Sequence, residues 1–252
     1  MIHKRKQMGK TTLTIEQVRE EIDRVDRSLL ALIAERLELA GAVRRAKSGA
    51  RFWRPSREES HVRELAAATE DAPGELVSRI WAELMSASLA LQGTMQLHIA
   101  IEGDALEVWS LVRDRFGAAL PAMSYPTTSS ALAAAYADDE GVAVLPAPGG
   151  MNSWWTALGA QGAMPDMHIL AGLPRTGDML WPRAVAVSTA DIQPSGHDET
   201  LLICSDHKSI DGAVLRAEAG EHKLISLDGF CEIAPAGTKI IGVLPKPMGQ
   251  NV

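Results

Sequence analysis

The stretch IEQVREEIDRVDRSLLALIAERLELAGAVRRAK, residues 15–47, decides the fold of the first third of the chain. Just before and inside it, Thr14 and Gln17 have the spacing of a capping box, which predicts that a helix begins here. Apolar residues then recur at alternating intervals of three and four, the pattern of a heptad seam: Ile15, Val18, Ile22, Val25, Leu29 and Leu32. The helix would span about 50 Å at 1.5 Å per residue. A small monomeric domain cannot cover a seam of that length, so we expect a partner chain to cover it.

The composition excludes several classes of protein. A chain of 252 residues fits one to three compact units, and a net charge of −7 argues against general nucleic-acid binding. Its two cysteines lack the spacing of metal ligands, which favours a reducing cytoplasm. Neither a secretory signal nor an apolar run long enough for a membrane span is present. We expect a cytoplasmic protein without a metal or a cofactor.

Two further helices are predicted before residue 95. Ser56 and Glu59 have the spacing of a second capping box, so a helix is expected from Ser56 to about Glu70. The sequence DAPG, residues 71–74, interrupts it, and a third helix runs from about Glu75 until Gly93 ends it. Its inward stripe is predicted to be Ile80, Trp81, Leu84, Met85, Ser88 and Gln92. Residues 11–94 should therefore form an all-α, three-helix domain.

The rest of the chain alternates between strand-like and helix-like segments. An α/β unit is expected over residues 95–192, with strands in QLHIAIEG, GVAVLPAPGG and AVAVSTADI and helices in EVWSLVRDRFG and SSALAAAYADD. Residues 191–199 are interpreted as a linker. A small α+β unit follows over residues 198–249, with a helix near Ala213 to Ala219 between strands in TLLICSD, HKLISLDGF and KIIGVLP. The predicted fold class is thus multi-domain.

One face of the first helix carries cations in phase with its apolar residues. Spacings of seven and eleven return to nearly the same direction on a helix, so Arg36, Val43 and Lys47 should share a face. Arg19 lies seventeen residues from Arg36, about 25 Å along the same helix, and so cannot share a small ligand with Lys47 in one chain. In an antiparallel pair of long helices, Arg19 can come from the partner protomer.

Polar residues of the other two helices complete a candidate pocket. Ser88 and Gln92 lie one turn apart within the apolar stripe of the third helix, and Arg57 and Glu58 open the second. Together with Arg36 and Lys47 they offer cations, a carboxylate, a hydroxyl and an amide, which suit a small polyanion that bears a hydroxyl group. Each residue alone has a plainer explanation, such as a surface ion pair for Arg36 or a helix-dipole effect for Glu58.

At this point the sequence resembles a known family. The segments VREEIDRVDRSLLALIAERLELAGAVRRAK, RPSREE and ELMSASLALQG, within residues 14–93, are similar to the all-helical class of chorismate mutases. The resemblance rests on R-x-x-I-x-x-x-D from Arg19 to Asp26, L-x-x-x-R from Leu32 to Arg36, Lys47, the Arg57–Glu58 pair, and S-x-x-x-Q from Ser88 to Gln92. It implies an intertwined homodimer in which Arg19 enters the partner's site.

The resemblance also implies a role for each residue. Arg19 and Arg36 would hold the two carboxylates of chorismate, with help from Ser88. Lys47 and Gln92 would bind the ether oxygen of the breaking bond, and Glu58 would hold the ring hydroxyl and steady Lys47. The other substrate contacts are Val43, Arg57 and Met85. Arg54 departs from the family, because many relatives have an acidic or amide residue there, near the hydroxyl.

These residue types suit the reaction that the family catalyses. The rearrangement of chorismate to prephenate is pericyclic and needs no nucleophile, proton transfer, metal or cofactor. The enzyme must hold a flexible dianion with its reacting ends together. It must also stabilise the negative charge that grows on the ether oxygen, which preorganised donors such as Lys47 and Gln92 would do.

The C-terminal two thirds resemble a shortened prephenate dehydratase followed by an ACT domain. Pro182-Arg183-Ala184 replaces the catalytic T-R-F segment of the dehydratase, so the dehydratase reaction is expected to be lost. The segment Asp211-Gly212-Ala213-Val214 stands near an effector segment of ACT domains. A dimer-stabilising or regulatory role is expected, with an aromatic amino acid as the candidate effector.

The expected function is therefore a chorismate mutase of phenylalanine and tyrosine biosynthesis. Three alternatives stay open: a bifunctional mutase–dehydratase, an isochorismate pyruvate-lyase with nearly the same pocket, and a non-catalytic regulator that binds aromatic metabolites. The length of the first helix and the fused C-terminal units favour the mutase over the lyase.

Overall fold

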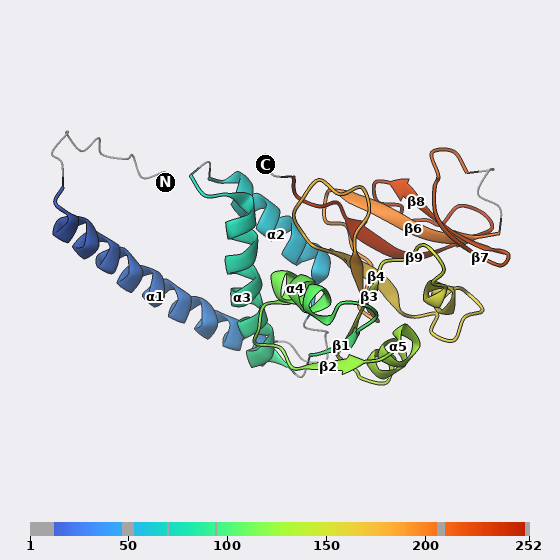
Figure 1. Ribbon diagram of the computed structural model, residues 1–252, viewed down its shortest axis with the longest axis horizontal. Helices are drawn as coiled ribbons and strands as arrows, with labels where there is room; N and C mark the ends of the chain where they lie inside the picture. Colours follow the sequence, from blue (N-terminus) through green and yellow to red (C-terminus); the bar gives the residue numbers. More distant parts are fainter. Residues whose placement is uncertain (1–12, 47–52, 70, 94, 206–209, 250–252) are drawn as a thin grey trace.

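A computed structural model describes residues 13–46, 53–69, 71–93, 95–205 and 210–249. The three predicted helices are confirmed as α1 (Ile15–Ala46), α2 (Pro55–Ala67) and α3 (Gly74–Gln92). Helix α1 extends away from the rest of the chain, and only its C-terminal part meets α3 (Figure 1). Of the described helices, none is long and apolar enough to cross a membrane.

Helix α1 begins as its sequence predicts and is then largely uncovered. The backbone N–H of Thr14 donates to Gln17 Oε1 at 2.9 Å, and that of Gln17 donates to Thr14 Oγ1 at 3.3 Å, which completes the capping box. All six seam residues from Ile15 to Leu32 are between 42% and 66% exposed. One copy of the chain therefore leaves the predicted seam facing solvent.

The second predicted capping box is wrong. Helix α2 begins at Pro55 after the N-cap residue Arg54, and no side chain caps it. Proline suits the first position of a helix, because its fixed φ is already helical and its missing N–H would have no partner there. Ser56 and Glu59 are both buried, and Glu59 pairs with arginines instead of the helix N-terminus.

Helix α3 is buried on more sides than its predicted stripe. It packs against α1 and α2, and also against α4 (Ala105–Phe116) of the C-terminal part. Ser88 is buried, as predicted, whereas Ile80 is 44% exposed, so its place in the inward stripe is wrong. The three packing partners instead bury Val77, Ser78, Ala82, Ser86 and Leu89. Gly93 ends the helix, as expected.

The strands described after residue 95 form one nine-stranded sheet in the order β2-β1-β3-β5-β4-β9-β6-β8-β7. Five of the strands belong to the predicted segments before the linker or lie between them: β1 (Gln96–Ala100), β2 (Ala122–Tyr125), β3 (Gly141–Pro146), β4 (His168–Leu173) and β5 (Ala184–Ser188). The others are β6 (Asp198–Cys204), β7 (Val214–Ala219), β8 (His222–Asp228) and β9 (Thr238–Pro245), and a short 3-10 helix covers Trp154–Leu158. The sequence prediction missed β2 and β4.

Helices α4 and α5 (Thr128–Tyr136) lie on opposite faces of the parallel part of the sheet, where β1 pairs with β2 and β3. Successive residues of β3 point to opposite faces, as expected for a strand. Val142 and Val144 pack with Phe116 of α4, whereas Ala143 and Leu145 pack with Leu132 of α5. Both faces of β3 are therefore buried, and α4 lies between the sheet and α3 (Figure 1).

The helix predicted near Ala213 to Ala219 is wrong, because these residues form strand β7. Ala219 pairs with His222, so β7 and β8 are joined by a tight turn in which Gly220 has a φ of 60°. Pairing along β8 outweighs the helix propensity of the alanines and Glu218. The C-terminal segment is thus four antiparallel strands rather than a β-α-β-β unit, and β9 joins it to β4. The strands before and after residues 192–198 belong to the same sheet. The domain boundary expected at these residues stays a prediction.

Candidate functional site

A cavity of about 390 Å³ lies among the three N-terminal helices. Helix α1 contributes one wall, α2 the second, and the C-terminal half of α3 the third. The lining residues are Arg36, Leu39, Ala40, Val43, Arg54, Arg57, Glu58, His61, Met85, Ser88, Leu89 and Gln92. The cavity is open on the side of α1, where Leu39 and Val43 are 62% and 43% exposed.

Arg36 is fixed against α3. Its Nη1 donates to the carbonyl oxygen of Leu84 at 2.9 Å and to Ser88 Oγ at 2.8 Å. Ser88 Oγ in turn donates to the same carbonyl at 2.6 Å. Burial lowers the pKa of Arg36, and the nearby carboxylate of Glu58 offsets part of this effect. A half-buried guanidinium with little compensating charge is a favourable place for an anion.

The wall formed by α2 combines a held carboxylate with an exposed basic rim. Glu58 Oε2 accepts a hydrogen bond from Arg115 Nη1 at 3.0 Å, and the Glu58 side chain is only 13% exposed. Arg54, Arg57 and His61 are exposed on the same side of the cavity. The site therefore contains one fixed acid among several basic side chains.

Behind this wall lies a buried ion cluster formed by Glu59, Arg115 and Arg175. Glu59 Oε1 is 2.9 Å from Arg115 Nη2 and 3.1 Å from Arg175 Nε, and Arg175 Nη1 lies 3.4 Å from Ser78 Oγ. Burial alone would raise the pKa of Glu59, but the charges of Arg175 and Arg115 and the hydrogen bond from Arg175 together lower it. Burial lowers the pKa of Arg175. This cluster connects α2 to α4 and to the loop after β4.

The structure places most of the predicted site residues around this one cavity. Seven of them line it: Arg36, Val43, Arg57, Glu58, Met85, Ser88 and Gln92. Lys47 lies outside the described residues. Arg19 is exposed on α1 and does not line the cavity, in keeping with its distance from Arg36 along the helix.

Sequence reasoning missed several neighbours of these residues. Leu39, Ala40 and His61 could have been found, since they follow Arg36 or Glu58 by three or four positions and so share their helix faces. Leu89 follows Ser88 directly and Met85 by four positions. Arg115 had no such signal, because its contact with Glu58 joins residues 57 positions apart.

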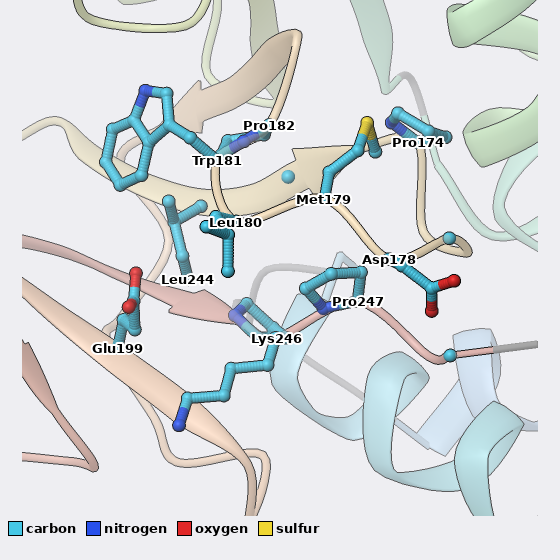
Figure 2. A pocket seen from close by; sticks show the side chains of 14 residues that line it. Pro174, Asp178, Met179, Leu180, Trp181, Pro182, Glu199, Leu244, Lys246 and Pro247 are labelled. Atoms are coloured by element: carbon cyan, nitrogen blue, oxygen red, sulfur yellow. The ribbon is translucent and has the colours of Figure 1, made fainter.

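A second cavity, of about 470 Å³, lies between the β4–β5 loop and the end of β9 (Figure 2). Its lining includes apolar side chains such as Leu180, Trp181 and Leu244. Two of the charged residues of its lining have partners within the chain: Glu199 pairs with Arg216 at 2.8 Å, and Lys246 pairs with Asp228. The third charged residue, Asp178, is exposed.

The C-terminal motifs do not gather at one site. Pro182 lines the second cavity, Arg183 pairs with Glu107 of α4, and Ala184 begins β5. The Asp211–Val214 segment lies in the turn that leads into β7, where Gly212 has a φ of 72°. Among the described residues, no group of three or more acidic, histidine or cysteine side chains could hold a metal ion.

Comparisons with known proteins identify the helical part of the chain. Residues 18–93 match the family of type II chorismate mutases. This segment contains the whole lining of the first cavity and ends before β1. No curated protein matches the chain. A solved structure titled "GqqA- a novel type of quorum quenching acylases" is similar at 13% identity and a TM-score of 0.41, over 61% of this chain and 96% of that chain.

Proposed function

We propose that this protein is a chorismate mutase, which rearranges chorismate to prephenate in the biosynthesis of phenylalanine and tyrosine. One observation carries the proposal: within the segment that matches the family, Arg36 is fixed on Ser88 at a cavity that Glu58 and Gln92 also line. A volume of about 390 Å³ suits a small ligand of one ring with two carboxylates.

The lining residues take roles that follow from their chemistry. Arg36, supported by Ser88, binds a substrate carboxylate, and Arg57 adds positive charge at the rim. Gln92 donates to the ether oxygen, and Glu58 accepts from the ring hydroxyl. Lys47, which lies outside the described residues, is proposed as the second donor to the ether oxygen. Val43 and Met85 pack against the apolar part of the substrate.

The reaction then requires only binding and electrostatics. An ether C–O bond breaks and a C–C bond forms within the same molecule, so no atom or electron passes to the protein. The cavity brings the two ends of the substrate together, which lowers the entropic part of the barrier. Donors aimed at the ether oxygen stabilise the charge that it gains in the transition state.

A homodimer would complete the site. The apolar seam of α1 is uncovered in one chain, and the cavity is open on the same helix at Leu39 and Val43. A second α1 packed antiparallel along the seam would cover both, and it would bring the partner's Arg19 to the cavity as a further cation for the substrate dianion.

The product of the reaction tests the assignment. We expect purified protein to convert chorismate to prephenate, detected by chromatography and mass spectrometry before and after acid treatment. Phenylpyruvate formed without acid would instead show a bifunctional mutase–dehydratase. Pyruvate released from isochorismate would show a lyase, and unchanged chorismate would overturn the enzymatic assignment in favour of a binding role.

The dimer is tested by a charge in the seam. Leu29→Glu should raise the dimer dissociation constant by about a hundredfold or more, since an unpaired carboxylate in an apolar contact costs several kcal/mol. Analytical ultracentrifugation should show monomers, and turnover of chorismate should fall with the dimer fraction. Ala31→Glu, which adds the same charge off the seam, is the control. A fully active Leu29→Glu monomer would contradict the shared site.

A further inference from the structure

Arg115 contacts Glu58, a lining residue of the mutase cavity, from outside the mutase segment. It belongs to α4, beyond residues 18–93, and its side chain is 1% exposed. Its Nη1 donates to Glu58 Oε2 at 3.0 Å, and its Nη2 lies 2.9 Å from Glu59 Oε1. Of these two acids, Glu58 lines the cavity and Glu59 does not.

We propose that Arg115 is a positioning residue of the mutase site, through which the C-terminal part of the chain sets the orientation of the Glu58 carboxylate toward the substrate hydroxyl. This role rests on the proposed mutase activity. It also makes the site a composite of two parts of the chain, rather than the property of the three helices alone.

Glu58 has a specific need for such a partner. A free glutamate side chain loses rotamer entropy on being fixed. Its carboxylate also shares the cavity with cations, and its negative charge raises the pKa of Arg36. An unheld Glu58 would compete with a substrate carboxylate for Arg36. The hydrogen bond from Arg115 occupies Oε2 and so opposes that competition.

Arg115 is itself held in place, which is required of a group that positions another. The Glu59 carboxylate forms an ion pair with Arg115 Nη2 and another with Arg175 Nε. The guanidinium lies 5.2 Å from the centre of the Phe116 ring. With the Glu59 carboxylate and the Phe116 ring against it in the interior, the guanidinium presents Nη1 to Glu58 in a defined direction.

A double-mutant cycle on kcat/KM for chorismate tests the role. We expect Arg115→Gln to lower kcat/KM by about ten- to a hundredfold, the range seen when outer partners of a site are removed. In a Glu58→Gln background, the same change should cost less than about twofold, because Arg115 then has no carboxylate to position. A merely structural role would give equal costs in both backgrounds.

Two further variants separate positioning from folding. Arg115→Lys keeps the charge but not the planar guanidinium, and it should recover part of the activity that Arg115→Gln loses. If Arg115→Gln does not fold, Arg115→Lys replaces it in the double-mutant cycle. Arg216→Gln removes an arginine ion pair elsewhere in the same sheet and should leave kcat/KM unchanged. Thermal unfolding of each variant defines the assay temperature.

The outcomes distinguish this inference from the proposed function. A wild-type protein that forms no prephenate would overturn both. An active wild-type protein whose Arg115 and Glu58 substitutions are additive, or whose Arg115→Gln variant keeps full activity, would overturn the positioning role alone.

Discussion

Arg36→Ala is expected to lower kcat/KM for chorismate by about a hundred- to a thousandfold, the loss typical of removing one preorganised donor to a charged transition state. Arg36 is fixed by Ser88 Oγ and the Leu84 carbonyl before any ligand binds, so no ordering of the side chain is needed during the reaction. Its half-buried guanidinium also lacks a full counter-charge, which the substrate carboxylate would supply. Steady-state kinetics on the purified variant measures the loss.

Two comparisons make this result specific. Arg36→Lys should lie between the wild type and Arg36→Ala, because lysine keeps the charge but not the planar fork. Arg79→Ala, on the exposed side of α3 and outside the cavity, should keep kcat/KM within about twofold. A well-folded Arg36→Ala protein with normal turnover would remove this cavity as the site of the reaction.

The N-terminal helices and much of their cavity could be predicted because the relevant signals are local. The start of α1 depends on two residues three positions apart, and its seam depends on a repeat within one helix. Ser88 and Gln92 reach the same cavity because they lie one turn apart on α3. The periodicity of a helix therefore predicts reliably which side chains share a face. The faces of the three helices then meet at one cavity.

Predictions failed where distant contacts decide the outcome. Helix propensity favoured a helix at Val214–Ala219, but pairing with β8 made it a strand. Ser56 and Glu59 have the spacing of a capping box, yet Glu59 is drawn to Arg115 and Arg175. Ile80 fits an apolar stripe, but the neighbours of α3 leave it exposed. In the first two cases a partner remote in sequence outweighs a local preference of about 1 kcal/mol or less.

The cluster around Glu59 is also the part of the molecule whose removal should cost the most stability. Glu59→Gln keeps the shape of the side chain but leaves Arg115 and Arg175 without their shared carboxylate in the interior. Breaking a buried pair in this way costs about 3–5 kcal/mol. Urea and thermal unfolding should show this loss, whereas Glu64→Gln, on the exposed side of α2, should change stability by less than about 0.5 kcal/mol.

The same residue predicts how stability depends on pH. Because the folded protein lowers the pKa of Glu59, the unfolded chain takes up a proton there first as the pH falls. The stabilisation is therefore complete above the ordinary glutamate value near 4.5 and is lost progressively below it. The difference in unfolding free energy between the wild type and Glu59→Gln should be constant near neutral pH and shrink below about pH 4.5. A difference that stays constant to pH 3 would mean that the ionised form of Glu59 does not supply this stability, and a difference under about 1 kcal/mol at neutral pH would mean that the two arginines find other partners.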